Sequence, residues 1–89
     1  MARIAFTPHL RAVAPTGVRE CAGANLAEVL NALAPEYPRL NDYVRDDQGR
    51  LRKHIAIFID GTLVAREIAL ARPLDAASDV FVFQALSGG

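Results

Sequence analysis

The stretch Asp79-Val80-Phe81-Val82-Phe83-Gln84-Ala85-Leu86-Ser87-Gly88-Gly89 decides how the rest of the sequence is arranged. Valine and phenylalanine alternate in its first half, and strand-forming residues at a period of two predict a half-buried strand. Small residues and two glycines follow directly. We therefore predict a rigid last strand that leads into a slim carboxyl-terminal segment, with the rest of the chain as its support.

Three further segments have the pattern of strands. Lys53 to Asp60 alternates strictly, and Asp60-Gly61 is a strong hairpin signal that predicts a returning strand from Thr62 to Val64. Arg3 to Thr7 alternates in the same way. The segment from Leu10 to Glu20 is expected to contain a loop and a second strand that folds back on the first.

One helix is clearly indicated after residue 24. Asn25 can cap it, Glu28 stands three residues later in the capping-box position, and Pro35 stops it. Its apolar residues repeat as i, i+3, i+4 and i+7: Leu26, Val29, Leu30 and Leu33. Pro38 to Val44 is predicted as a short second helix or turn, whereas Arg66 to Ala71 has too little periodicity for an assignment.

The predicted order is strand, strand, helix, strand, strand, strand. This order indicates an α+β fold, with a mixed sheet of about four to five strands and one main helix packed on one face. A chain of 89 residues can build one core but not two. We expect residues 1–89 to form a single domain, with residues 85–89 as a flexible carboxyl-terminal tail.

Composition excludes several function classes. Ten basic residues balance ten acidic ones, so there is no basic excess to indicate a nucleic-acid or membrane-surface partner. No apolar run approaches the length of a membrane-spanning helix, and the first residues do not resemble a signal peptide. The only cysteine, Cys21, cannot form an internal disulfide, which favours a reducing, cytoplasmic location.

The two terminal glycines suggest a chemical role. They have no Cβ to obstruct a narrow channel, and the four residues from Leu86 to Gly89 extend about 13 Å, enough to thread a partner's active site. A carboxylate is a poor electrophile until it becomes an acyl-adenylate or thioester, so this terminus fits a substrate of an ATP-using partner. A chain end without a role remains the alternative.

Several stretches together resemble the MoaD/ThiS family of sulfur-carrier proteins, which have the ubiquitin-like β-grasp fold. They are the turn Asp46 to Arg52 with the strand and hairpin His54 to Gly61, the turn Arg72-Pro73-Leu74, and residues 79–89 with their terminal Gly-Gly. Two departures are Ala76-Ala77-Ser78, where an Asp-Gly-Asp type of turn is frequent, and Gln84, where proline is common.

The resemblance implies a protein cosubstrate rather than an enzyme, although it could count as the small subunit of a synthase complex. Gly89 would be adenylated by a ubiquitin-activating-type adenylyltransferase and converted to a thiocarboxylate, whose sulfur goes to a biosynthetic acceptor enzyme. Gly88, Ser87 and Leu86 would thread the partner. ATP and magnesium would belong to that partner, because this chain has no phosphate-binding loop.

The last strand also predicts a contact surface. If Val80 and Val82 face the helix, Phe81 and Phe83 face outward, beside Phe58. Exposed aromatic side chains next to the tail would form a partner-docking patch, especially Phe83. The alternative is that both phenylalanines pack inward or under loops.

Other reactive residues form no pattern of their own. His9 and His54 lack a nucleophile or carboxylate partner, and we expect no metal or cofactor site in this chain. Cys21 is expected to be a small, partly buried residue. The cluster of Arg50, Arg52 and Lys53 is interpreted as a solvated loop, or less favourably as a steering surface for an acidic partner.

Two other functions compete with the sulfur carrier. One is a ubiquitin-like modifier that joins its terminal carboxylate to lysine amines of other proteins. The other is a non-covalent β-grasp module that binds proteins through the aromatic patch. Among carriers, the molybdopterin and cysteine types are favoured over the thiamin and siderophore types.

Overall fold

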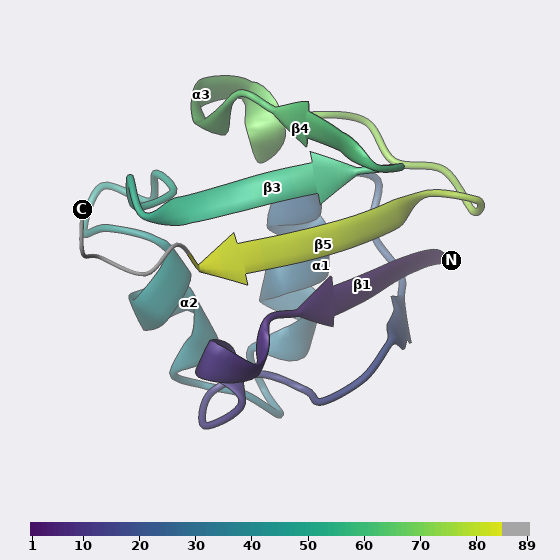
Figure 1. Cartoon of the computed structure of the whole chain (residues 1–89). Helices are drawn as coiled ribbons and strands as arrows, with labels where there is room; N and C mark the ends of the chain where they lie inside the picture. Colours follow the sequence, from purple (N-terminus) through teal and green to yellow (C-terminus); the bar gives the residue numbers. More distant parts are fainter. Residues whose placement is uncertain (85–89) are drawn as a thin grey trace.

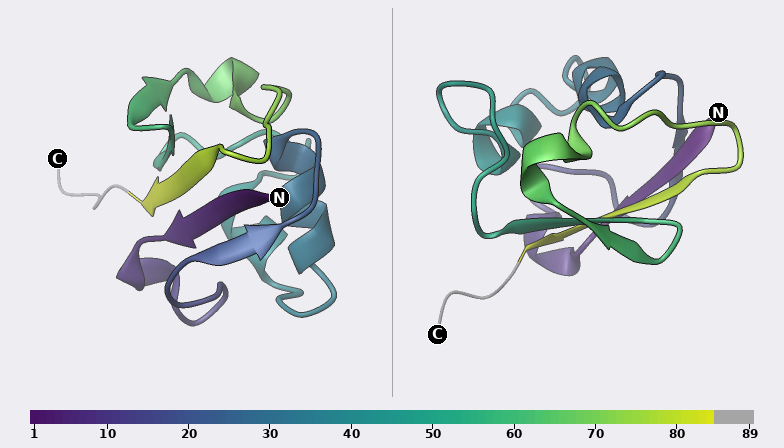
Figure 2. Two further views of the ribbon diagram at one scale, coloured as in Figure 1. Left: turned by 90° about the vertical axis from the view of Figure 1, so that its right-hand side faces the viewer. Right: turned by 90° about the horizontal axis from the view of Figure 1, so that it is seen from above.

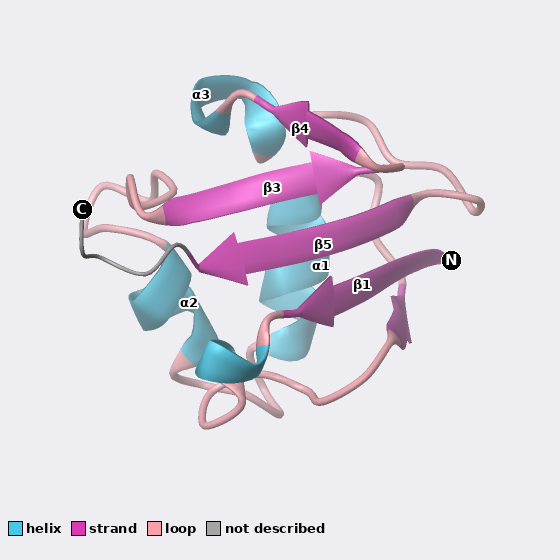
Figure 3. Cartoon of the chain, viewed as in Figure 1, coloured by secondary structure: helices cyan, strands magenta, loops and turns pink. Residues whose placement is uncertain are grey.

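The computed structural model describes residues 1–84, and residues 85–89 lie outside the described part. Strand-forming residues and a capped amphipathic segment give the elements in the order β1 (Ala2–Phe6), a 3₁₀ helix (Pro8–Leu10), β2 (Arg19–Cys21), α1 (Leu26–Leu33), α2 (Leu40–Val44), β3 (Ile55–Ile59), β4 (Thr62–Val64), α3 (Arg66–Ala69) and β5 (Asp79–Gln84). Figure 3 shows these helices and strands along the chain.

The strands form one mixed sheet in the order β2-β1-β5-β3-β4. β1 and β5 are parallel, and the other neighbouring pairs are antiparallel. The last strand of the sequence therefore lies in the middle of the sheet, between the first strand and β3 (Figure 1). Val82 pairs with Phe6 on one side and with Ile57 on the other.

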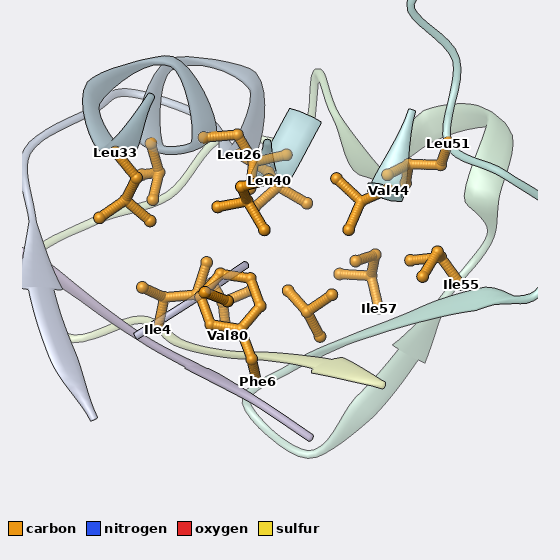
Figure 4. Packing of buried hydrophobic residues seen from close by; sticks show 14 of the residues in the cluster. Ile4, Phe6, Leu26, Leu33, Leu40, Val44, Leu51, Ile55, Ile57 and Val80 are labelled. Atoms are coloured by element: carbon orange, nitrogen blue, oxygen red, sulfur yellow. The ribbon is translucent and has the colours of Figure 1, made fainter. Parts of the chain in front are cut away.

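The core lies between one face of the sheet and α1. Figure 4 shows Leu26 and Leu33 of α1 opposite Ile4, Ile57 and Val80 of the sheet. These side chains expose at most 4% of their surface, because helix positions at i, i+4 and i+7 meet strand positions at a period of two. The predicted mixed sheet with one main helix on one face is confirmed.

The start of α1 differs slightly from a standard capping box. The Asn25 side chain accepts a hydrogen bond from the Glu28 N–H at 2.9 Å, as predicted. The Glu28 carboxylate reaches one residue further back and accepts from the Ala24 N–H at 3.0 Å. The first bond satisfies an amide that the first turn of a helix leaves without a partner, and the second satisfies the amide of the residue just before the cap.

The predicted second strand that folds back on the first is confirmed as β2, which pairs antiparallel with β1, but it is shorter than the segment from Leu10 to Glu20 suggested. The strand is only Arg19–Cys21, and Val18 precedes it with 67% of its surface exposed. Val13 is buried, but in the irregular segment after the 3₁₀ helix. The short strand is ordered by pairing with β1, which local alternation cannot reveal.

Two other segments extend or correct the sequence prediction. β3 begins at Ile55 rather than Lys53, because the Ile55 N–H closes a turn onto the Arg52 carbonyl at 3.0 Å. The unassigned segment after Arg66 contains α3, a single turn that buries Ala69. The short helix within Pro38–Val44 is confirmed as α2, with Leu40 and Val44 fully buried.

Candidate functional site

The alternation of β5 separates core residues from surface residues. Val80 and Val82 expose 3% and 1% of their surface under α1, whereas Phe81 and Phe83 expose 38% and 39% on the other face. Residues i and i+2 of a strand share a face, so the sequence dictates this arrangement once one face is buried. The predicted outward orientation of both phenylalanines is confirmed; their docking role stays a prediction.

Phe58 of β3 joins them, as the sequence suggested. It pairs directly with Phe81 across the two strands and is half-buried, while Ala56 pairs with Phe83. The Phe81 and Phe83 ring centroids are 6.4 Å apart, within the range of a favourable aromatic pair. We call Phe58, Phe81 and Phe83 the aromatic face.

A shallow hollow of about 540 Å³ lies against the aromatic face. Ala5, opposite Phe81 in the parallel strand β1, supplies a small side chain there, and the exposed Val18 supplies a wall. The hollow also borders an ion pair in which Arg3 Nε lies 2.7 Å from Asp79 Oδ1. An apolar surface rimmed by polar groups is typical of a protein-interaction site.

Sequence reasoning missed three members of this surface: Ala5, Val18 and Leu63. Leu63 of β4 is 62% exposed and pairs with Phe58, so it extends the apolar surface toward the sheet edge. The alternation of β1 already places Ala5 on the face of the sheet opposite Ile4 and Phe6, which is the face of the phenylalanines. No local pattern marked Val18, because it precedes a strand of three residues.

The helices lie on the opposite side of the sheet. Figure 2 shows α1 and α2 stacked over one face of the sheet. Among residues 1–84, no α-helix covers the opposite face, which carries the phenylalanines of β5.

The end of β5 is held by both of its neighbours. Gln84 pairs with Ile55 of β3, and its N–H donates to Thr7 Oγ1 at 3.2 Å. The buried Thr7 in turn donates its N–H to the Val82 carbonyl at 3.0 Å. The point at which the chain leaves the sheet is thus fixed. The predicted reacting and threading residues, Leu86 to Gly89, lie outside the described residues.

The remaining candidate residues do not form a site. His9 is exposed and His54 half-buried. In residues 1–84 no three His, Cys, Asp or Glu side chains come together in a group that could hold a metal ion. Cys21 is more buried than expected, with 7% exposed, and this burial raises the pKa of its thiol. The longest helix of the described residues, eight residues, is too short to cross a membrane.

The basic cluster near residue 50 is organised by Asp46. Asp46 Oδ1 accepts the N–H groups of Gln48 at 2.9 Å and Arg50 at 3.0 Å, which closes the turn. The bond from Arg50 is the main cause that lowers the pKa of the Asp46 carboxyl. Arg52 donates to the Asp42 carbonyl at 3.1 Å. The turn fits the expected solvated loop.

A model of the ThiS family matches residues 9–89, nearly the whole chain including its terminal glycines. The chain belongs to the ThiS family. No curated protein matches it, whereas several solved structures do.

Haloferax volcanii SAMP1 is 25% identical, with a TM-score of 0.74 and coverage of 99% of this chain and 98% of that one. The Amycolatopsis orientalis BexX/CysO complex matches at a TM-score of 0.85, 14% identity and full coverage of both chains. Mycobacterium tuberculosis CysO gives 0.82 and 18% identity, covering 97% and 100%.

These similarities establish the fold as the ubiquitin-like β-grasp, as predicted. Together with family membership, they support a small sulfur-carrier or ubiquitin-like modifier protein rather than a catalytic enzyme.

Proposed function

We propose that this ThiS-family member is a sulfur carrier whose Gly89 carboxylate is the reacting group. A ubiquitin-activating-type adenylyltransferase, using its own ATP and Mg²⁺, would convert that carboxylate to an acyl-adenylate. Sulfur would replace AMP to give a thiocarboxylate, which a biosynthetic acceptor enzyme would consume. The observation that carries the proposal is the family match, which extends through Gly88 and Gly89.

The aromatic face supports a division of labour between docking and chemistry. Phe81 and Phe83 precede the reacting terminus by only a few residues on a strand fixed on both sides. A partner that binds Phe58, Phe81 and Phe83 would receive the following residues, led by Leu86 and Ser87, in a defined direction. Gly88 would then pass the narrowest part of the channel.

A second candidate is a ubiquitin-like modifier. It is favoured by the likeness at 25% identity to Haloferax volcanii SAMP1, a small archaeal modifier protein. Both functions need the same activated acyl group, and they differ in the nucleophile: sulfur for the carrier, a lysine amine of another protein for the modifier.

The deciding experiment is intact mass measurement after incubation with the activating partner, ATP, Mg²⁺ and a sulfur donor. The carrier function predicts that one terminal oxygen is exchanged for sulfur. A modifier predicts covalent adducts of higher mass when cell extract is added. An unchanged mass, with a partner proven active on another substrate, contradicts both acyl-transfer functions.

A further inference from the structure

The chain contains a single lysine, Lys53, against nine arginines. A guanidinium group remains protonated, whereas a lysine amine can lose its proton and be acylated. Lys53 and the α-amino group of Met1 are therefore the two amines in this sequence that an activated carboxyl group can acylate.

Lys53 lies just before the start of β3, at the same end of the sheet as the last residue of β5. It is exposed, in the turn that the Ile55 N–H closes onto the Arg52 carbonyl. Ile55 begins β3 and pairs with Gln84, the last residue of β5. Figure 1 shows the start of β3 beside the end of β5. The lysine thus belongs to the region from which residues 85–89 continue.

Chain length allows Gly89 to reach this lysine. Ile55 is two residue steps after Lys53, a span of at most about 7 Å, and paired Cα atoms are about 5 Å apart. The Lys53 Cα is therefore within about 12 Å of the Gln84 Cα. The five residues after Gln84 can extend about 16 Å, before the reach of the lysine side chain is added.

Met1 is placed much less favourably. β1 is parallel to β5, and Arg3 pairs with Asp79, so Met1 lies beyond the opposite end of β5. The distance from there to Gln84 is about 20 Å along the strands. Proximity therefore selects Lys53 over the α-amino group.

The Lys53 side chain is also accessible. It lines an open hollow with Ala56, Leu63 and Arg66. None of the ion pairs among residues 1–84 ties it to a carboxylate. Within the described part of the chain, no carboxylate has to be displaced before the amine can react.

We propose that Lys53 is an acyl-acceptor site that captures the activated Gly89 of its own chain. The proposal rests on the proposed function, which supplies the adenylate. The unprotonated Lys53 amine attacks the Gly89 acyl carbon and a C–N bond forms. The bond from that carbon to the AMP oxygen breaks, AMP leaves with the electron pair, and one amine proton goes to solvent. The product is a same-chain isopeptide.

Capture removes the carboxyl group on which sulfur transfer depends. Sulfur and the Lys53 amine compete for one electrophile, and the intramolecular amine gains from a high effective concentration. Capture therefore takes the carrier out of use when the sulfur donor is scarce.

The test supplies the activated carboxyl without any partner. Residues 1–89, prepared as a carboxyl-terminal alkyl thioester by intein cleavage, are held at mildly alkaline pH and weighed intact. We expect a monomer lighter than the free acid by one water, with Lys53 and Gly89 joined in one proteolytic fragment. Since the thioester replaces the adenylate, a failed proposed function leaves this result unchanged.

Two variants serve as controls. Lys53→Arg keeps the charge and removes the amine, and is expected to hydrolyse only to the free acid. Adding Arg3→Lys to Lys53→Arg moves the amine to the far end of β5 and keeps the ion pair with Asp79; we expect about tenfold less isopeptide or lower. The proposal is overturned by hydrolysis alone in the parent chain, by acylation of Met1, or by a covalent dimer in place of the lighter monomer.

Discussion

At the scale of one residue, we expect Phe83 to contribute to partner binding but little to the free energy of folding. The residue is 39% exposed, and across the sheet it pairs with Ala56, a small side chain. Replacing it with serine should change the free energy of unfolding by about 1 kcal/mol or less. An aromatic anchor of an interface contributes about 2 kcal/mol, so Phe83→Ser should lower kcat/KM of the activating partner roughly thirtyfold.

The matched control for this prediction is Ile68→Ser. Ile68 is 56% exposed but belongs to α3, outside the aromatic face. Chemical denaturation of both variants and steady-state activation assays make the comparison. Equal activation of Phe83→Ser and Ile68→Ser would mean that the aromatic face does not dock the activating partner.

Asp46 predicts a specific response to acid. Its pKa is lowered in the folded protein, chiefly by the Arg50 N–H, so the ionised carboxylate stabilises the fold. This contribution is complete above the unfolded pKa of about 4 and is lost as pH falls through the lower, folded pKa. Asp46→Asn should therefore reduce stability at neutral pH, and its difference from the parent should vanish in strong acid. Thermal unfolding across that range measures this, and parallel pH profiles would contradict it.

At the scale of elements, the sequence revealed those with a full local signal. β3 and its hairpin, α1 and β5 have clear periods, caps or turn residues, and all four are confirmed. β2 and α3 have three and four residues, too few to display a period, and they form because β1 and the core stabilise them. The parallel pairing of β1 with β5 joins segments more than seventy residues apart, which no local pattern specifies.

Alanine substitutions at Gly23 and Gly61 test how closely the chain packs at the start of α1 and in the turn between β3 and β4. A Cβ on Gly23 would lie 2.8 Å from Val29 Cγ2 and 2.9 Å from the Val29 backbone nitrogen, in the first turns of α1. Gly61 has a φ of 80° in the turn between β3 and β4, but nothing lies within 4 Å of its added Cβ. Gly61→Ala should therefore cost only the left-handed backbone strain, about 1 kcal/mol. Gly23→Ala should cost about 2–3 kcal/mol, because backbone atoms must move.

Urea unfolding of the two alanine variants measures this difference. Equal losses of stability would show that α1 can shift away from the Cβ of residue 23 at little cost.

At the scale of the whole molecule, the sequence was enough to predict which face of the sheet carries the candidate site. It was not enough to predict how far the site extends over that face. Alternation in β5 and β3 was enough to place Phe81, Phe83 and Phe58 on one side of the sheet. Leu63 follows from the predicted hairpin, in which it pairs with Phe58, whereas Val18 joins that surface only because β2 pairs with β1 at the far side of the sheet. Strand order depends on long-range pairing, so this part of the surface required the structure.

The whole molecule also allows docking and chemistry to be removed separately. Deleting Gly88 and Gly89 removes the proposed reacting group and leaves the aromatic face and the pairing of β5 in place. The truncated chain should not be adenylated, and its unfolding temperature should match that of the parent. It should still inhibit activation of the full chain, with an inhibition constant near the KM of the parent.

Adding Phe83→Ser to the truncation should weaken that inhibition roughly thirtyfold, because the chain then lacks its anchor as well. Competition assays with the activating partner measure both constants. A truncated chain that retains full activity in cells would instead identify a non-covalent binding module, because acyl transfer cannot proceed without the terminal glycine. If the truncated chain no longer inhibits, most of the binding energy comes from Gly88 and Gly89. That result would contradict the proposal that the aromatic face binds the partner while the tail only reacts.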